Sequence, residues 1–452
     1  MENDQENNNL KRSNIRYLAL VLACLLTVGN FFVYDNPAVL QSKLESRLDI
    51  SALEYNLFYS VYSIPNIFLP IFGGFIVDKI GNKVGNLIFA SFIALGQGIF
   101  AIGVTAKSYP LAIVGRAVYG CGGESINVSQ FNAITKWFSS QQLSISLSII
   151  ASVDRLSTAI NDLTTPLLAS QISLQFSLFF GFFICLLSLT SGIFLSFLDK
   201  KRKSEDSFSN TPSNPSNKIT LKDIKNYKIS FWLLCLNCGL VNSDVYCFNN
   251  IASSYFQSRF GYSVVESGRI ISITFIISGL SCPIIGFFLD KYGKRIYFIM
   301  FSSFSITLTH CFFAMIPDSN RPVLSILCMV LLGTGFSVYT AVIWSTVPFL
   351  VPHQASATAF GIQTACYNLA LVIFPICIGS ILDNYSSPNN YLYTSFFFIG
   401  LGVLGIFSTF ALYFANKKAD KSLIRSNKSQ DLEKGMVFIG GPENISKTFG
   451  FE

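Results

Sequence analysis

The chain has 452 residues and a formal net charge of +7; 51% of its residues are hydrophobic, 15% are aromatic and only 13% are charged. A soluble globular protein carries about a quarter charged residues, so this composition excludes that class. The hydrophobic residues form separate runs of roughly 20, the length that crosses a bilayer as an α-helix. The short alternating segments of a membrane β-barrel do not occur in the sequence.

Twelve such runs follow one another, six before and six after a polar stretch. The first run, Tyr17 to Val33, has no signal-peptide cleavage site behind it, so we interpret it as a membrane span. The sequence therefore predicts an all-α membrane protein with twelve transmembrane helices in two six-helix bundles. The predicted spans are residues 16–35, 52–77, 84–104, 110–130, 143–168, 173–198, 229–256, 264–289, 295–315, 322–350, 357–382 and 392–415.

The polar stretch between the two sets starts with four basic residues, Lys200 to Lys203, and continues with Ser, Asn and Pro. It cannot bury a core and predicts a flexible linker. Basic residues gather in cytosolic loops, which places the termini and linker in the cytosol and accounts for the net charge without a nucleic-acid partner. We expect an N-terminus at 1–15, bundles at 16–198 and 229–415, a linker at 199–228 and a tail at 416–452. Only five basic residues fall on the opposite side: Lys43, Arg47, Lys107, Arg259 and Arg321.

The sequence has few groupings of residues typical of disulfides, metal sites or catalytic sites. All eleven cysteines fall in predicted spans, so we expect no disulfides. Cys235 and Cys238 have the spacing of a metal or redox pair, but no second pair accompanies them, and core packing is the favoured interpretation. No nucleophile–base arrangement appears either. We expect neither an enzyme nor a site for a metal or cofactor.

One loop motif occurs twice, at positions offset by 212 residues. It reads Gly74-Phe-Ile-Val-Asp78-Lys79-Ile-Gly81-Asn82-Lys83 after the second span and Gly286-Phe-Phe-Leu-Asp290-Lys291-Tyr-Gly293-Lys294-Arg295 after the eighth. The first glycine lets helices approach closely, the aspartate accepts hydrogen bonds at a neighbouring helix N-terminus, and the second glycine permits a tight turn.

Both copies resemble the G-x-x-x-D-[RK]-x-G-x-[RK] signature of the major facilitator superfamily. This resemblance implies two six-helix halves that alternate between inward-open and outward-open states around a central site. It also implies that the two loops are conformational latches rather than substrate ligands. The expected latch residues are Gly74, Asp78, Lys79, Gly81, Lys83, Gly286, Asp290, Lys291, Gly293 and Arg295.

Charged residues inside spans are costly and therefore point to function. Glu124 in the fourth span and Arg155 in the fifth both fall at middle depth, and glycines before Glu124 leave room beside its carboxylate. Facing one cavity, the two side chains would bind a zwitterion with separated amino and carboxylate groups. The alternative is a structural ion pair, either Glu124 with Arg155 or Asp154 with Arg155.

Other polar and aromatic span residues are weaker candidates. Tyr59 and Tyr62 precede Pro65 in the second span and are candidates to line the cavity, and Trp344 either stacks on a substrate or fills the bundle. The remaining charged span residues are assigned structural or peripheral positions. The resemblance to the superfamily implies that Arg116 is structural. Asp244 and Arg269 are expected to snorkel or line the outer vestibule, His310 to pack within its span and His353 to lie in a cytosolic loop.

Further stretches resemble the major facilitator superfamily domain-containing protein 1 group. They include Tyr34 to Ala38, Tyr62 to Asn66, Gly122 to Ser125, Asp154 to Thr158, Pro352 to Gln354 and Thr358 to Gly361. That group is similar to lysosomal carriers that export dipeptides to the cytosol with a glycosylated lysosomal membrane accessory protein. The resemblance implies that Glu124 and Arg155 clamp the two peptide termini.

Two departures bear on the cellular site. The family's N-terminal acidic dileucine signal is absent, and the nearest candidate, Asp420 to Ile424, is a poor match. Lysosomal placement is therefore implied by the resemblance alone, with the plasma membrane as alternative. The lumenal side has one sequon, at Asn384, which lies too near the membrane for efficient glycosylation. This fits an accessory partner that protects the carrier.

Three functions remain open from the sequence. The first is an uncoupled dipeptide carrier, and the second is a proton-coupled symporter of organic anions or amino acids with Glu124 titrating. The first span lacks the charged cluster of proton-coupled oligopeptide transporters, and the usual signature of sugar porters is missing after Leu198. The third is a non-transporting receptor or scaffold, which would not need two latches.

Overall fold

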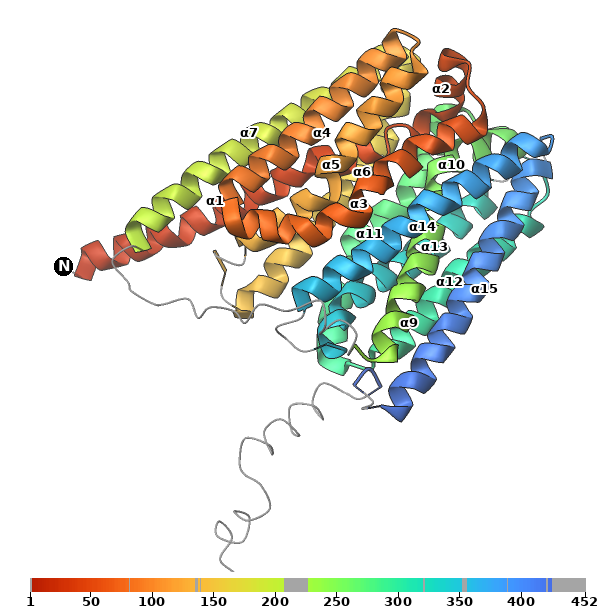
Figure 1. Ribbon diagram of the computed structural model, residues 1–452. Coiled ribbons are helices and arrows are strands. Elements are labelled where there is room, and N and C mark those ends of the chain that lie inside the picture. Colours follow the sequence, from red (N-terminus) through yellow and green to blue (C-terminus); the bar gives the residue numbers. More distant parts are fainter. Residues whose placement is uncertain are drawn as a thin grey trace, which may run out of the picture.

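The computed structural model describes residues 2–80, 82–134, 137–138, 140–206, 227–319, 322–351, 356–387, 389–419 and 422–424, and every regular element in them is helical (Figure 1). The first half comprises α1 (Glu2–Tyr34), η1 (Ala38–Leu40), α2 (Gln41–Leu48), α3 (Ala52–Ile80), α4 (Asn82–Thr105), α5 (Tyr109–Ile134), α6 (Ser140–Gln171) and α7 (Leu174–Asp206). The second half comprises α9 (Ile229–Asn237), η2 (Cys238–Asn242), α10 (Ser243–Phe260), α11 (Val264–Tyr292), α12 (Arg295–Met315), α13 (Pro322–Thr346), η3 (Val347–Phe349), α14 (Ser356–Asn384) and α15 (Asn389–Lys418).

The helices contain the predicted spans, because length and hydrophobicity define the parts that cross the membrane, but α1 begins already at Glu2 and α7 continues to Asp206, into the predicted linker. In the described residues, nine helices are long and apolar enough to cross a membrane, and α3, α5 and α6 complete the twelve. Two further features were not predicted. The short helix α2 follows α1, and the seventh span is broken by the π-helical turn η2 between α9 and α10.

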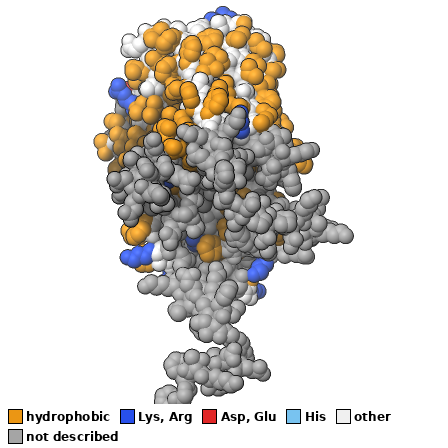
Figure 2. All heavy atoms as spheres, turned by 90° about the vertical axis from the view of Figure 1, so that its left-hand side faces the viewer, with side chains coloured by type: hydrophobic (Ala, Val, Ile, Leu, Met, Phe, Trp, Pro, Cys, Tyr) orange, Lys and Arg blue, Asp and Glu red, His pale blue; other side chains and the backbone are white. Residues whose placement is uncertain are grey.

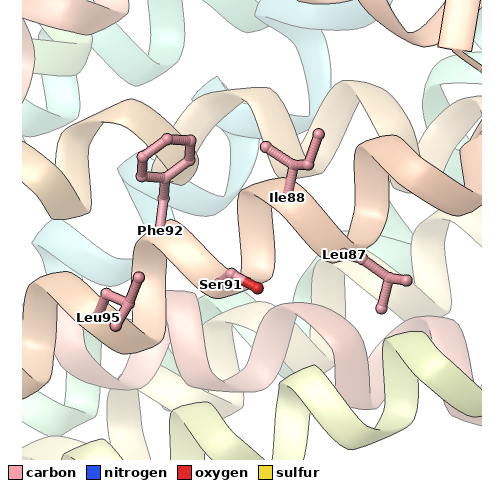
Figure 3. A pocket seen from close by; sticks show the side chains of 5 residues that line it. All are labelled: Leu87, Ile88, Ser91, Phe92 and Leu95. Carbon is pink, nitrogen blue, oxygen red and sulfur yellow. The ribbon is translucent and has the colours of Figure 1, made fainter.

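The outside of the helices carries large hydrophobic side chains, as contact with lipid requires. Phe183, Phe194 and Phe197 of α7 are each about 60% exposed, and Figure 2 shows a face whose described part is mostly hydrophobic. A shallow depression of about 280 Å³ on α4 belongs to the same surface; it is lined by Leu87, Ile88, Ser91, Phe92 and Leu95 (Figure 3).

Each half has its own hydrophobic core. One core is built from residues between Ala19 and Leu195 and the other mostly from residues between Tyr227 and Leu423. Tyr246, a half-buried residue of α10, packs against both cores. The two halves meet where α3 packs on α14 and α6 packs on α11.

The same polar bond recurs inside both halves. In the first, the Tyr119 hydroxyl of α5 lies 2.8 Å from the Asn30 carbonyl and 2.9 Å from its side-chain oxygen. In the second, Tyr339 of α13 contacts Asn237 of α9 in the same way, at 3.0 and 2.9 Å. Buried polar groups in a membrane need partners, and the repeated solution supports two halves built alike.

The halves touch at the end of the bundle that holds α2, opposite the ends of α7 and α15; we call it the α2 end. There, Asp383 of α14 accepts hydrogen bonds from the backbone N–H groups of Ala52 and Leu53, at 2.9 and 3.0 Å. These groups start α3 and have no partner within their own helix. A carboxylate of one half therefore caps a helix of the other.

The distance between α11 and α6 can be followed at three glycines of α11, from the space that an added Cβ atom would meet. A Cβ added at Gly268, near the α2 end, would collide with the Asp162 carbonyl oxygen. At Gly279 it would lie 3.0 Å from the Leu156 side chain, and at Gly286 the nearest atom is 3.9 Å away. The contact between α6 and α11 is therefore tightest near the α2 end and relaxes to ordinary van der Waals contact by Gly286.

A short segment after α15 folds back onto the second half. Leu423 is fully buried, its carbonyl accepts from the Ile296 N–H at the start of α12, and its N–H donates to the Asn416 side chain. The poor dileucine candidate of the sequence therefore has its leucine packed inside the protein, where an adaptor cannot reach it.

The close contacts at the α2 end generate a prediction. Gly268→Ala and Gly379→Ala should each favour opening of this end, because the new Cβ would collide with the Asp162 carbonyl in the first case and lie 2.6 Å from Leu53 Cα in the second. Hydrogen–deuterium exchange of residues 38–44 and 249–257 should rise in both variants. Gly400→Ala is the matched control, because nothing lies within 4 Å of its Cβ; equal exchange in all three would contradict the prediction.

Candidate functional site

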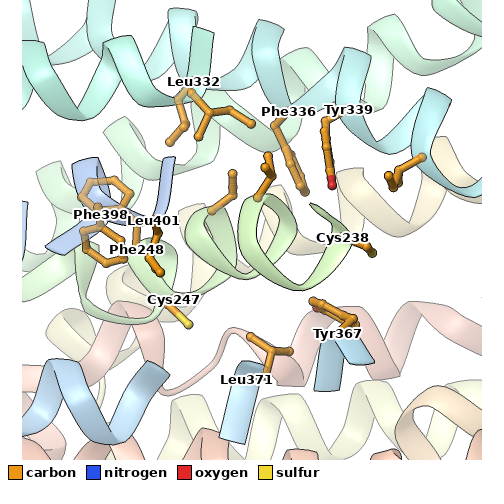
Figure 4. Packing of buried hydrophobic residues seen from close by; sticks show 14 of the residues in the cluster. Cys238, Cys247, Phe248, Leu332, Phe336, Tyr339, Tyr367, Leu371, Phe398 and Leu401 are labelled. Carbon is orange, nitrogen blue, oxygen red and sulfur yellow. The ribbon is translucent and has the colours of Figure 1, made fainter. Parts of the chain in front are cut away.

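Arg155 projects from the middle of α6 toward the second half. Its guanidinium donates a hydrogen bond to the Tyr246 hydroxyl at 2.5 Å and lies 5.0 Å from the Phe336 ring centroid. Phe336 and Tyr367 approach the α9–α10 helix from α13 and α14 (Figure 4). Within the described part of the chain no carboxylate forms an ion pair with Arg155, so its counter-charge is not supplied by a direct neighbour.

Glu124 lies on α5 and is half-buried. Its carboxylate accepts a long hydrogen bond, 3.5 Å, from Asn127 one turn further along the helix. The charges of Glu124 and Arg155 are close enough to act on each other, yet the described residues include no ion pair between them. The structure thus places a carboxylate and a guanidinium within electrostatic range of one another without a direct ion pair between them.

Asp154 does not pair with Arg155 either. Consecutive residues of a helix point about 100° apart, and the Asp154 carboxylate accepts a hydrogen bond from Thr27 of α1 at 2.6 Å. Both structural ion pairs considered from the sequence, Glu124–Arg155 and Asp154–Arg155, are therefore wrong for the described residues.

The expectation for the glycines before Glu124 is also wrong. They do not leave room for a ligand, because neighbouring helices fill the space. A Cβ at Gly123 would collide with the Tyr62 hydroxyl, one at Gly120 with the Tyr62 carbonyl oxygen, and one at Gly122 with the Phe89 carbonyl oxygen. The glycines let α3 and α4 approach α5, and they place the Tyr62 ring beside Glu124.

Arg116 is fully buried in a cage of aromatic rings. Its guanidinium donates to the carbonyls of Phe58, Val33 and Tyr34 at 3.3 to 3.4 Å. Two of these carbonyls end α1, where no intrahelical donor remains. The rings within 6 Å of Arg116 belong to Tyr34, Tyr59, Tyr62, Phe100 and Tyr119. This environment fits the structural role expected for Arg116.

The weaker candidates are dispersed. Tyr59 is fully buried in the Arg116 cage and bonds to Tyr55; among the described residues its hydroxyl forms no hydrogen bond with Glu124 or Arg155. Trp344 packs against the core of the second half, two turns along α13 from Phe336. Of the aromatic candidates, only Tyr62 lies beside the Glu124–Arg155 pair.

Asp244 was expected to snorkel or line the vestibule, and this is wrong. The residue is fully buried inside the second half, 3.4 Å from the His310 ring nitrogen. His310 packs within its span as predicted, stacked on Phe398. Arg269 is exposed on α11, and His353 lies outside the described residues.

The latch motifs are only partly described. Gly81 lies outside the described residues, and nothing is described of the side chains of Asp78, Lys79 and Asp290 or of the surroundings of Gly74. Lys83 and Lys291 are exposed. Gly293 has φ +63° and ends α11, which confirms the predicted tight turn. Arg295 contacts Ser345 at 2.7 Å and the Phe349 ring at 4.3 Å.

Sequence reasoning missed the contribution of α10. Tyr246 bonds to Arg155, and Asn249, one turn later, donates to Asp35 at 2.7 Å. Asp35 appeared in the sequence only as part of a family stretch. The one available signal was the polar character of α10, whose Asn, Ser and Gln residues are unusual for a membrane span.

Comparison with known proteins agrees with this architecture. Residues 20–375 match the family model described as Major Facilitator Superfamily. The chain belongs to the major facilitator superfamily. Its fold is shared with the nucleoside transporter NupG, whose crystal structure superposes with a TM-score of 0.67 at 16% identity, over 88% of this chain and 99% of that one.

Several curated relatives resemble the chain over most of its length. The human lysosomal dipeptide transporter MFSD1 is 30% identical over 427 residues, which cover 92% of this chain and 90% of the relative. The zebrafish (Danio rerio) protein of the same name is 31% identical over 409 residues, 88% and 86% of the two chains. The hexuronate transporter of Escherichia coli K12 matches only 137 residues at 25% identity.

The Arg116 cage predicts a large effect on stability. Arg116→Leu should remove the charged donor from three buried carbonyls, of which the Val33 carbonyl keeps a hydrogen bond from the Asn36 N–H. Hydrogen bonds to charged groups contribute about 1.5–3 kcal/mol, so the melting temperature of the purified protein should fall markedly. Arg269→Leu is the control, because Arg269 is exposed. Equal melting temperatures for the two variants would contradict a structural role for Arg116.

The packing of Tyr62 against Gly123 can be tested by a double-mutant cycle. Gly123→Ala should destabilise the protein by about 1–3 kcal/mol, because the added methyl group meets the Tyr62 ring. In a Tyr62→Ala background the same change should have little effect on the melting temperature. Additive effects of the two substitutions would show that Gly123 is needed for another reason.

Proposed function

We propose that this chain is an alternating-access carrier that moves dipeptides from the lysosome lumen to the cytosol, as a uniporter. Glu124 binds the peptide amino group and Arg155 binds the peptide carboxylate. The observation that carries the proposal is the pair itself: two opposite charges at one site with no direct ion pair between them, in a chain whose relatives over nine-tenths of its length are named lysosomal dipeptide transporters.

The chemistry of the pair favours a zwitterion. Arg155 has one hydrogen-bond acceptor among the described residues, the Tyr246 hydroxyl, although a guanidinium has five N–H donors. A planar carboxylate engages two of them at once. A sugar or a singly charged solute would leave one charge of the site unpaired, which is costly in a partly buried position.

Tyr62 is the aromatic residue best placed to contact a substrate, because its hydroxyl lies over Gly123 beside Glu124. Tyr59 supports the site through the Arg116 cage, and Trp344 belongs to the second half at a greater distance along α13. We therefore include Tyr62 in the binding site and treat Tyr59 and Trp344 as supporting residues.

Orientation follows from the basic residues. Lys43, Arg47, Lys107 and Arg259 all lie at the α2 end, which we assign to the lumen, and the termini and the linker at 199–228 are assigned to the cytosol. The two bundles at 16–198 and 229–415 move relative to each other, and the two loop motifs hold the cytosolic end closed in the lumen-open state.

Two rival functions use the same fold. A proton-coupled symporter would use Glu124 as the titrating group, and a receptor or scaffold would not cycle at all. A catalytic function has no support, since the relatives are named transporters. A glycosylated accessory protein in the lysosomal membrane is a further expected partner, which would cover the lumenal α2 end.

The clamp is tested with substrates that lack one terminus. Uptake of a labelled dipeptide into proteoliposomes should be abolished in Glu124→Gln and in Arg155→Ala, while both proteins remain folded. An unlabelled C-terminal amide should compete about tenfold less well than the free dipeptide, as expected for a lost hydrogen bond to a charged group. Wild-type uptake in both variants, or equal competition by the amide, would contradict the clamp.

The same proteoliposomes separate the uniporter from the symporter. A pH gradient should not drive accumulation of the dipeptide above equilibrium, because a uniporter only equalises its concentration. Glu124→Asp keeps the charge and serves as the matched variant. Accumulation that follows the gradient and is lost in Glu124→Gln would establish proton coupling instead.

A further inference from the structure

Helix α10 presents one polar stripe to the first half of the protein. Its members fall at positions i, i+3, i+4, i+7 and i+11, which places them along one side of the helix. Each is hydrogen-bonded across the interface between the halves. The stripe consists of Tyr246 with Arg155, Asn249 with Asp35, the Asn250 carbonyl with Tyr55, Ser253 with the Val39 carbonyl, and Gln257 with Ser42.

Tyr246 is the inner end of this stripe. The other four bonds lie toward the α2 end, and only the Tyr246 bond reaches the candidate site. The Tyr246 ring packs on Tyr34 of the first half at 6.0 Å and on Phe336 and Tyr367 of the second at 5.7 and 5.9 Å. One side chain therefore joins the proposed carboxylate-binding arginine to the helix that closes the α2 end.

The start of α10 adjoins a break in the regular helix. The π-helical turn Cys238–Asn242 directly precedes it, and such turns interrupt the regular hydrogen-bond ladder of a helix. α9, on the other side of the turn, is fixed to α15 by Asn237, which bonds to Gly405, Ser408 and Thr409. A hinge at this turn would let α10 swing while α9 stays in place.

We propose that Tyr246 is a positioning residue that substitutes for the substrate carboxylate. Its hydroxyl oxygen accepts from Arg155 when no substrate is bound, a substrate carboxylate displaces it, and the displacement frees the inner end of the α10 stripe. This inference rests on the proposed function. It identifies Tyr246 as the residue through which substrate binding at Arg155 affects the opening of the α2 end.

The physical reason is the cost of an unsatisfied guanidinium. Each change of conformation takes Arg155 through a state with little water, where a charge without an acceptor is strongly disfavoured. A loaded carrier supplies the peptide carboxylate. An unloaded carrier needs an acceptor of its own, and the Tyr246 hydroxyl, with the Phe336 ring at 5.0 Å from the guanidinium, supplies it.

The inference separates two modes of transport. Net uniport requires the unloaded carrier to return, whereas counterflow, with dipeptide on both sides, needs only loaded carriers. Removal of the Tyr246 hydroxyl should therefore slow the first mode and spare the second. It should also tighten dipeptide binding, because the competing acceptor on Arg155 is lost.

The experiment compares wild type, Tyr246→Phe and Tyr367→Phe in proteoliposomes. In Tyr246→Phe, net dipeptide uptake should fall at least about tenfold while counterflow stays within about twofold, as expected from the loss of a hydrogen bond to a charged group. Tyr367→Phe removes a hydroxyl from the neighbouring ring, which forms no hydrogen bond with Arg155 in the described part of the chain, and should keep the wild-type ratio of the two modes. The half-saturating dipeptide concentration in a thermal-shift titration should fall only in Tyr246→Phe.

Three results would overturn the inference. Equal loss of both modes in Tyr246→Phe would mean a merely structural role, and wild-type rates of both modes would mean that the hydroxyl is dispensable. Weaker dipeptide binding would make Tyr246 a substrate ligand instead. If the wild-type protein itself shows neither net uptake nor counterflow of any dipeptide, the proposed function falls, and this inference falls with it.

Discussion

A guanidinium inside a membrane protein cannot lose its charge, so the surrounding structure must satisfy it, and this constraint organises the first half of the carrier. Arg116 and Arg155 meet it in opposite ways. Arg116 is enclosed by carbonyls and rings that leave no direction open. Arg155 is held by one hydroxyl of the other half and by the face of Phe336. The first arginine is a fixed part of the scaffold, and the second can exchange its partner.

The same contrast explains why the interface between the halves is polar near the site. Hydrogen bonds between uncharged side chains are individually weak in net terms, so a row of them can be opened and remade in each cycle. The close glycine contacts at the α2 end add a steric requirement to these hydrogen bonds, because the helix surfaces fit together there only when the helices are fully closed. The structure thus combines a reversible polar stripe with a steric stop.

Much of the fold can be predicted from the sequence, because bilayer thickness and hydrophobicity leave few alternatives. The repeated loop motif likewise identifies the two halves, and Gly293 adopts the turn that the motif requires. Contacts between side chains that are distant in the sequence cannot be predicted in this way. The glycines near Glu124 serve Tyr62, Asp244 faces His310, and Tyr246 carries no motif at all. Each of these depends on how helices are rotated against each other, which hydrophobicity does not specify.

The segment that follows α15 has a practical meaning for protein engineering. Leu423 supplies the acceptor for a backbone N–H at the start of α12 and fills a buried position in the second core. The folded unit therefore runs past the last helix, which ends at Lys418. A purification tag or fluorescent fusion joined directly at Lys418 would remove Leu423 and its contacts. A junction placed after Ile424 keeps them. The two designs share every transmembrane helix, yet they should differ in the yield of folded protein.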